Sequence, residues 1–174
     1  MGISVEMFCK TYKANLKAKD KTFEDFIKKH ITTDYINFNM KDAICTNIIK
    51  TSCYEKSGDR EIIKINSLAR YMLFIMNLIK EYTDIEIEFK DGKAVEQYDE
   101  LNKIGAISTL ISAIPESEYA EFNTILNMKL DDLRDNEYSV IAFLYNFKES
   151  LSISEDVINS AIEMIVKQDE DKNE

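Results

Sequence analysis

The chain has 174 residues, of which 45% are apolar and 31% are charged, and it contains only four Gly and one Pro. Its net charge is −10, and the excess is uneven: residues 1–64 hold 12 basic and 9 acidic residues, and residues 65–174 hold 10 and 23. This is the composition of a globular protein, the scarcity of Gly and Pro argues against a strand-rich sandwich or barrel, and the acidic body disfavours direct binding of nucleic acid.

Apolar residues at helical spacing predict three helices in the first part of the chain. The first follows Ser4, a good N-cap, and the second begins near Thr22 after a polar linker. The third follows Asn39. Between the last two, residues 32–38 are β-branched and aromatic and read as an extended connection. Residues 55–61, EKSGDRE, are the clearest turn in this half of the sequence.

The middle of the chain contains the strongest helical pattern. Residues 61–65 are a candidate short strand that would pair with 32–38 in a β ribbon. Residues 68–82 follow the capping pair Asn66–Ser67 and are apolar almost all round, so we expect a central helix buried on most sides. Apolar and acidic residues then alternate over 85–89, which predicts a short strand.

A long helix is expected over 93–114, with Gly105 marking a bend and Pro115 ending it. Three further helices are expected over 117–135, 140–151 and 154–166, before a polar, frayed tail at 168–174. The predicted fold is mainly α: one helical domain over 1–174, a bundle of six to seven helices around 68–82 with room for one short β ribbon and for a subdomain break near 90–93.

Few residues suit catalysis or metal binding. His30 is the only histidine, it lies beside Lys28 and Lys29, and we expect it to be exposed or half-buried. The three cysteines, Cys9, Cys45 and Cys53, have neither zinc-ligand nor dithiol spacing and read as reduced thiols. No phosphate-binding glycine motif or nucleophile elbow occurs. We therefore assign no catalytic, cofactor-binding or metal-binding residue and expect a protein that is not an enzyme.

Two acidic groups are the candidate partner-binding residues. Counted from Asp84, the first group fails the calcium-loop pattern, and the second lies at spacings that ordinary helix-face ion pairs with Lys129 and Arg134 explain. Both groups remain candidates for contact with a basic protein surface. They consist of Glu86, Glu88 and Asp91, and of Asp131, Asp132, Asp135 and Glu137 with Tyr138.

The aromatic content points weakly in the same direction. Nine Phe and nine Tyr occur without Trp, and most must lie in the core. Several tyrosines lie near predicted element ends, where exposed rings often anchor interfaces. They are Tyr35, Tyr54, Tyr138 and Tyr145.

No targeting or membrane segment is expected. The most apolar run, Tyr71–Met76, is far shorter than the ~20 residues that cross a bilayer, and the N-terminus lacks a signal-peptide pattern. The reduced cytoplasm, or a particle assembled there, is the expected location.

Two stretches carry a resemblance to known proteins. Residues 70–89, RYMLFIMNLIKEYTDIEIEF, and residues 98–139, with IPESEYAEF and a later DD…NE, resemble small acidic helical proteins of bacteriophages and prophages from low-GC Gram-positive bacteria. The resemblance covers about half the chain and includes no active-site motif. It implies a protein of virion assembly or structure, or a host-takeover factor, located in the host cytoplasm or the virion.

The sequence therefore favours a phage protein that acts by protein–protein interaction in virion assembly or structure, bound to itself or to another phage protein. The alternative is an inhibitor of a basic host nucleic-acid-binding protein, in which carboxylates stand in for backbone phosphates. A small enzyme is the third and weakest hypothesis. Neither direct nucleic-acid binding nor membrane association is expected.

Overall fold

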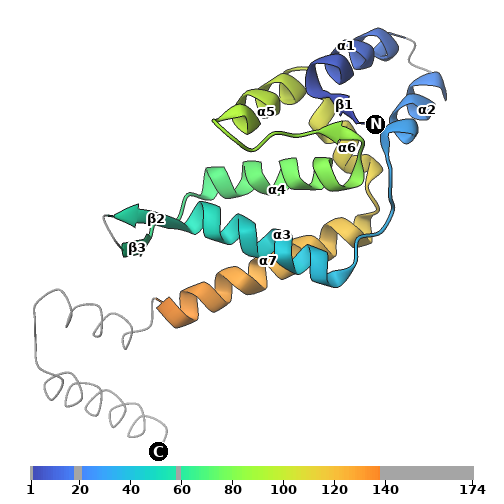
Figure 1. The fold of residues 1–174 in the computed structure, drawn as a ribbon. Helices are drawn as coiled ribbons and strands as arrows, with labels where there is room; N and C mark the ends of the chain where they lie inside the picture. The colour runs from blue at the N-terminus through green and yellow to red at the C-terminus, as the bar shows by residue number, and fades with distance from the viewer. Residues whose placement is uncertain (1, 18–20, 58–59, 138–174) are drawn as a thin grey trace, which may run out of the picture. The chain divides into compact units, whose positions relative to one another are not determined.

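The computed structural model describes residues 2–17, 21–57 and 60–137. The chain divides into two units, residues 1–127 and 128–174, and each is described by itself. Seven helices and two pairs of short strands make up the described part, which confirms the mainly helical prediction (Figure 1). The helices expected over 140–151 and 154–166 and the tail at 168–174 lie outside the described residues.

The elements follow one another with short connections. In chain order they are β1 (Ile3–Ser4), α1 (Val5–Leu16), α2 (Lys21–His30), α3 (Phe38–Cys53), β2 (Tyr54–Ser57), β3 (Arg60–Ile63), α4 (Ser67–Tyr82), β4 (Ile85–Glu86), α5 (Lys93–Lys103), α6 (Ala106–Ala113) and α7 (Glu116–Glu137).

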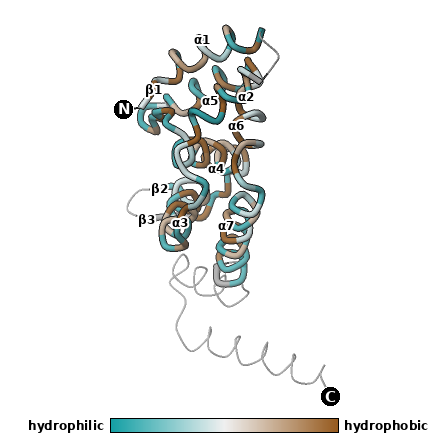
Figure 2. The backbone as a smooth tube through the Cα atoms, turned by 90° about the vertical axis from the view of Figure 1, so that its right-hand side faces the viewer, coloured by the Kyte–Doolittle hydropathy of each residue, from teal (hydrophilic) through white to brown (hydrophobic). Residues whose placement is uncertain are grey.

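Helix α4 is the centre of the first unit, as its apolar sequence predicts. It packs against α3, α5 and α6, and α1 covers α5 on the side away from α4 (Figure 1). Figure 2 shows apolar, brown residues along α4 and α6 in the middle of this unit. The largest fully buried apolar side chains come from several helices: Tyr82, Phe8, Phe122, Ile48, Met76, Leu78, Ile79, Leu101 and Leu110.

Side-chain caps start the helices where the sequence offers them. The Ser4 hydroxyl accepts a hydrogen bond from the Met7 amide at 3.4 Å, as predicted. Helix α3 begins two residues earlier than expected, because Asn37 and not Asn39 caps it and accepts from the Met40 amide at 3.0 Å. The predicted cap at Asn66 is confirmed by its bond from the Ala69 amide.

The β ribbon exists, but its predicted partner strand was wrong. Strand β3 pairs antiparallel with β2, with Tyr54 opposite Ile63 and Ser57 opposite Arg60, so most of the stretch read as a turn over 55–61 belongs to two paired strands. Pairing neighbouring segments closes a much shorter loop than pairing with 32–38. Of the stretch 32–38, residues 32–37 are an irregular connection, in which the Ile36 amide donates to Glu118 at 3.0 Å, and Phe38 begins α3.

The alternating stretch 85–89 forms less strand than predicted. Only Ile85 and Glu86 are in β4, which pairs in parallel with β1. The amide of Ile3 donates to the carbonyl of Asp84 at 2.8 Å, and Ile31 bridges to Thr83. The 83–86 segment therefore ties the start of the chain and the end of α2 to the end of α4.

Gly105 interrupts the long helix predicted over 93–114. Its φ of +73° lies in the left-handed region, so α5 ends at Lys103 and α6 begins at Ala106. Helix α6 ends before Pro115, as expected. Helix α7 runs to Glu137, two residues past the break expected at Asp135, a difference of the size usual for helix ends.

We expect Gly105→Ala to lower the free energy of unfolding by about 1 kcal/mol, measured by urea denaturation. A Cβ at Gly105 would meet nothing within 4 Å, so the loss comes from backbone strain alone. Gly105→Asn is the matched variant and should lose less, because Asn adopts positive φ more readily. Equal losses for the two variants would contradict this explanation.

Candidate functional site

An apolar groove lies between the first turns of α4 and α5. Asn66 caps α4, and Gly92, with a φ of +78°, precedes α5, so both helices begin next to the groove. The cavity measures about 330 Å³. Its lining residues are Asn66, Leu68, Ala69, Tyr71, Met72, Val95, Tyr98 and Asp99.

Three large apolar side chains of this groove are exposed to solvent. The side chain of Leu68 is in the first turn of α4, and the residue is 79% exposed. Tyr71 is 51% exposed and Val95 is 53% exposed. The expectation that helix 68–82 is buried on most sides therefore fails at its first turn, where Leu68 and Tyr71 are exposed.

Two tyrosines join the helices at the groove. The rings of Tyr71 and Tyr98 lie edge to face with centroids 6.4 Å apart. Burial raises the pKa of Tyr98, and a hydrogen bond with Tyr71 and the negative charge of Asp99 raise it further. The Tyr98 hydroxyl is therefore bonded to Tyr71 within the groove.

Asp99 is the only charged residue that lines this groove among the described residues. It is exposed, and no Lys or Arg of the described chain forms an ion pair with it. The lysine that starts α5, Lys93, pairs with Glu88 at 2.6 Å instead. The groove is thus apolar with one uncompensated carboxylate at its edge.

A buried ion cluster forms a second notable arrangement in the first unit. The ammonium group of Lys41, on α3, is fully buried and donates to Glu118 at 2.8 Å and to Glu121. The other carboxylate oxygen of Glu118 accepts from the Tyr82 hydroxyl at 2.5 Å and from the Ile36 amide at 3.0 Å. The cluster therefore joins α3, α4, the start of α7 and the 32–38 connection.

The hydrogen bonds of the cluster favour the charged forms of Lys41 and Glu118. Burial by itself would lower the pKa of Lys41, but hydrogen bonds to Glu118 and Glu121 outweigh it and hold that pKa above its usual value. Burial would raise the pKa of Glu118, but hydrogen bonds from Lys41, Tyr82 and Ile36 lower it overall. Burial, followed by the Glu118 hydrogen bond, raises the pKa of Tyr82. Each of these groups is bonded within the protein, so the role of the cluster is to hold the surrounding elements together.

His30 is buried, which corrects the expectation of an exposed or half-buried residue. Its Nδ1 lies 2.8 Å from Asp84 Oδ1, and its ring packs edge to face against Phe8 and Phe26. The amide of Asp84 also donates to the His30 carbonyl. The histidine thus fixes the end of α2 to the segment after α4.

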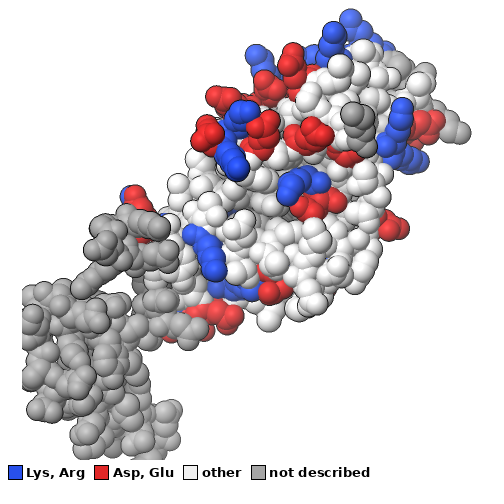
Figure 3. All heavy atoms as spheres, viewed as in Figure 1, with Lys and Arg blue, Asp and Glu red and all other residues white. Residues whose placement is uncertain are grey.

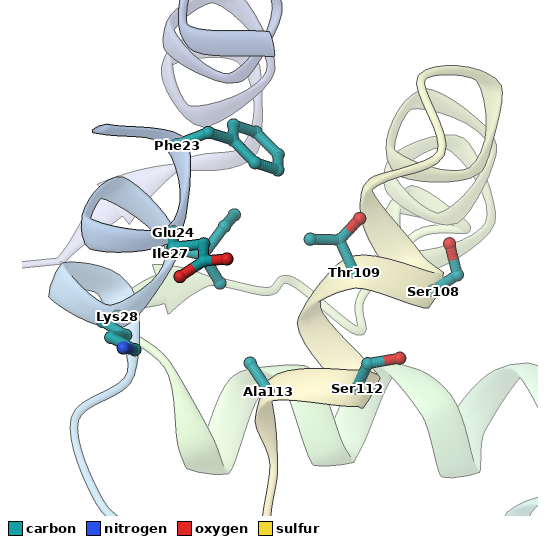
Figure 4. Close-up of a pocket in the computed structure, with 8 residues that line it drawn as sticks. All are labelled: Phe23, Glu24, Ile27, Lys28, Ser108, Thr109, Ser112 and Ala113. Atoms are coloured by element: carbon teal, nitrogen blue, oxygen red, sulfur yellow. The ribbon is translucent and has the colours of Figure 1, made fainter. Parts of the chain in front are cut away.

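A larger, more open cavity of about 530 Å³ separates α2 from α6 (Figure 4). Phe23, Glu24 and Ile27 extend from α2 toward α6, and Thr109 and Ala113 lie on the facing side. The Thr109 hydroxyl is already bonded to the Tyr12 hydroxyl at 2.9 Å and to the Gly105 carbonyl. This cavity therefore offers fewer free polar groups than its lining suggests.

A third cavity, between α1 and α5, is lined by Cys9, Lys13 and Glu100 together with Glu6, Lys10, Lys103 and Ile104. Burial raises the pKa of Cys9, Glu100 raises it further, and Lys13 opposes them with a smaller effect. Because the thiolate is the reactive form of cysteine, this thiol is poorly suited to nucleophilic chemistry.

The structure does not gather the predicted partner-binding acids into one described surface. Glu86 is exposed on β4, Glu88 pairs with Lys93, and Asp91 follows in a left-handed turn. The remaining described acids are on α7 in the second unit, where Asp131 pairs with Arg134 at 3.5 Å. Asp132 and Asp135 are exposed there, Glu137 is the last residue of α7, and Tyr138 lies outside the described residues.

Of the predicted tyrosine anchors, Tyr35 is exposed and Tyr54 is half-buried, and the other two, Tyr138 and Tyr145, lie outside the described residues. Sequence reasoning missed the groove, because Leu68 and Tyr71 were assigned to a buried helix. It also missed Lys41 and Glu118. A signal for both existed: Lys41 precedes Cys45 and Ile48 on one helix face, and Glu118 precedes Phe122 and Leu126 in the same way.

Comparison with known proteins finds no family model, no curated protein and no solved structure that matches this chain. Within the described residues, no helix has the length and apolar character needed to span a membrane. In the same part of the chain, no three His, Cys, Asp or Glu side chains are grouped so as to hold a metal ion.

We expect Lys41→Met to lower the free energy of unfolding by about 3–5 kcal/mol, because it leaves buried carboxylate without its counter-charge. Chemical denaturation at pH 7 measures the loss. Lys64→Met is the matched control: it breaks an exposed pair with Glu55, whose atoms are 2.6 Å apart, and should cost less than about 1 kcal/mol. Similar losses for both variants would refute the structural role of the cluster.

A second prediction concerns the free energy of unfolding at low pH. The folded pKa of Glu118 lies below its usual value of 4.5, so its contribution is complete above pH 4.5 and is lost as the pH falls through the folded pKa. Tyr82→Phe removes one bond that lowers this pKa, so the acid-dependent loss of stability should be smaller than in the wild type and should end at a higher pH. Urea denaturation from pH 7 to 3 measures this, and Tyr119→Phe is the control. If the free energy of unfolding of Tyr82→Phe depends on pH as that of the wild type does, the Tyr82 hydrogen bond does not lower the pKa of Glu118.

Proposed function

We propose that this protein acts by binding another protein through the groove between α4 and α5. The observation that carries the proposal is the gathering of Leu68, Tyr71 and Val95, all more than half exposed, around one cavity. Protein surfaces rarely leave large apolar side chains together in water unless they bind something. Tyrosine is also among the residues that dominate binding energy at interfaces.

A protein side chain suits this cavity better than a small metabolite does. Its volume, about 330 Å³, is at the lower end for small-molecule sites. Its polar groups are mostly engaged: Asn66 caps α4, and the two tyrosines bond to each other. A metabolite site normally needs several converging polar groups, whereas an apolar anchor from a partner protein needs a dry cavity with a polar rim.

The DNA-mimic alternative has less support. Such a protein needs a continuous row of carboxylates, but Lys and Arg lie among Asp and Glu on the face drawn in Figure 3. Several acids are also neutralised by neighbours, as Glu88 is by Lys93 and Asp131 by Arg134. We therefore keep the docking role as the proposed function.

Within this proposal, the resemblance of residues 70–89 and 98–139 to acidic phage proteins favours a virion component as the partner, with a basic host protein as the alternative. The first of those stretches contains Tyr71 and Met72, and the second contains Tyr98 and Asp99. The proposed site therefore falls within the part of the chain that carries the resemblance.

We expect Leu68→Ser combined with Val95→Ser to abolish binding of the partner with a stability change within about 0.5 kcal/mol, because both side chains already lie in water. Immobilised wild type and double variant would be incubated with a lysate of phage-producing cells, and retained proteins would be quantified by mass spectrometry. The best candidate would then be purified, and its complex would be measured by light scattering.

The control is Met7→Ser combined with Met40→Ser, which removes two exposed apolar side chains outside the groove. A protein retained at least about tenfold better by wild type and control than by the groove variant, and forming a defined complex when purified, is the expected result. Equal retention of every protein by all three forms would refute the proposal.

A further inference from the structure

The groove has an electrostatic feature that points to the chemistry of its partner. Asp99 lines the cavity and is exposed, and no cation among the described residues pairs with it. Glu96, three residues earlier on the same helix, is also exposed, and residues three apart are neighbours on a helix surface. The apolar cavity is thus bordered on the α5 side by negative charge.

The lysines of α5 are engaged or directed elsewhere. Lys93 is paired with Glu88 at 2.6 Å, and Lys103, which is exposed four residues after Asp99, lines the cavity between α1 and α5. Arg70, on α4, is half-buried and forms no ion pair with Asp99. A partner that places an ammonium or guanidinium group beside Asp99 would therefore meet a carboxylate that is available to pair.

The net charge separates a second copy from a different protein. Two copies of this chain, each with a net charge of −10, repel one another, whereas a basic protein is attracted. Like-charge repulsion at a surface also contributes to specificity, because it disfavours partners whose charge has the same sign.

Resting on the proposed function, we infer that the occupant of the groove is an amphipathic helical segment of a basic partner protein. One large apolar side chain of that segment fills the cavity between Leu68 and Val95. A Lys or Arg one turn away, at i+3 or i+4, lies on the same face of the partner helix and pairs with Asp99.

The test uses three fluorescein-labelled helical peptides. The first carries Leu at helical spacing with Lys at i+4, the second has Glu in place of each Lys, and the third has Ser in place of each Leu. Binding to the full chain is measured by fluorescence anisotropy at about 50 mM and about 300 mM salt, to separate close pairing from long-range attraction.

We expect the Leu/Lys peptide to bind the wild type and the Ser peptide to bind far more weakly. Asp99→Asn should weaken the Leu/Lys peptide by about threefold to fivefold, the range of an exposed ion pair. The matched control, Asp25→Asn, removes the same charge from an exposed position on α2 and should change binding by less than about twofold. Asp99→Lys should reverse the preference and bind the Leu/Glu peptide more tightly than the wild type does.

The outcomes separate this inference from the proposed function. If Leu68→Ser abolishes binding but Asp99→Asn and Asp25→Asn behave alike, the groove is a docking site and its partner is not selected by charge. If Leu68→Ser leaves the affinity of the Leu/Lys peptide unchanged, both the docking site and the inference fail. Concentration-dependent self-association of the wild type that Leu68→Ser removes would identify a second copy as the occupant and overturn the inference.

Discussion

The buried ammonium group of Lys41 is the interaction on which the described fold depends. It neutralises carboxylates from the start of α7, and Glu118 in turn accepts from Tyr82 at the end of α4 and from the backbone at Ile36. One ion cluster thus sets the position of three helices and one connection. Replacing a buried pair by apolar residues is often neutral, but removing one partner is strongly destabilising, so the cluster specifies which helices meet more than it adds net stability.

The groove lies at the other end of α4, where the side chains are exposed instead of buried. Tyr82 and its neighbours are fully covered, whereas Leu68 and Tyr71, three to four turns earlier, are left in water. The cluster holds the buried end of α4 in place, and Asn66 caps the exposed end. A rigid helix that presents apolar side chains at a fixed end loses little conformational entropy on binding, which favours affinity for a partner.

Hydrophobic period was enough to predict the mainly helical fold and the central position of α4. The glycine at position 105 predicted a bend, and the structure has a break between two helices there. Hydrophobic period failed where the decisive contacts are distant in sequence. The ribbon partner was wrong because period cannot tell 32–38 from 54–57, although the shorter loop favours the latter. His30 was expected nearer the surface because Phe8 and Asp84, which cover it together with Phe26 of its own helix, are on segments distant in sequence. The groove was missed because the hydrophobic period of a helix does not distinguish an exposed apolar residue from a buried one.

The measurement that tests the central claim most directly is a titration of the isotopically labelled chain with a basic apolar helical peptide, followed by methyl and amide NMR. We predict that the methyl signals of Leu68 and Val95 and the amides around Tyr98 shift together and saturate, while the signals of the Lys41 cluster and of Cys45 and Ile48 on α3 stay fixed. Shifts that centre on the cavity between α2 and α6, or that spread through the core without saturating, would contradict a preformed docking groove on α4 and α5.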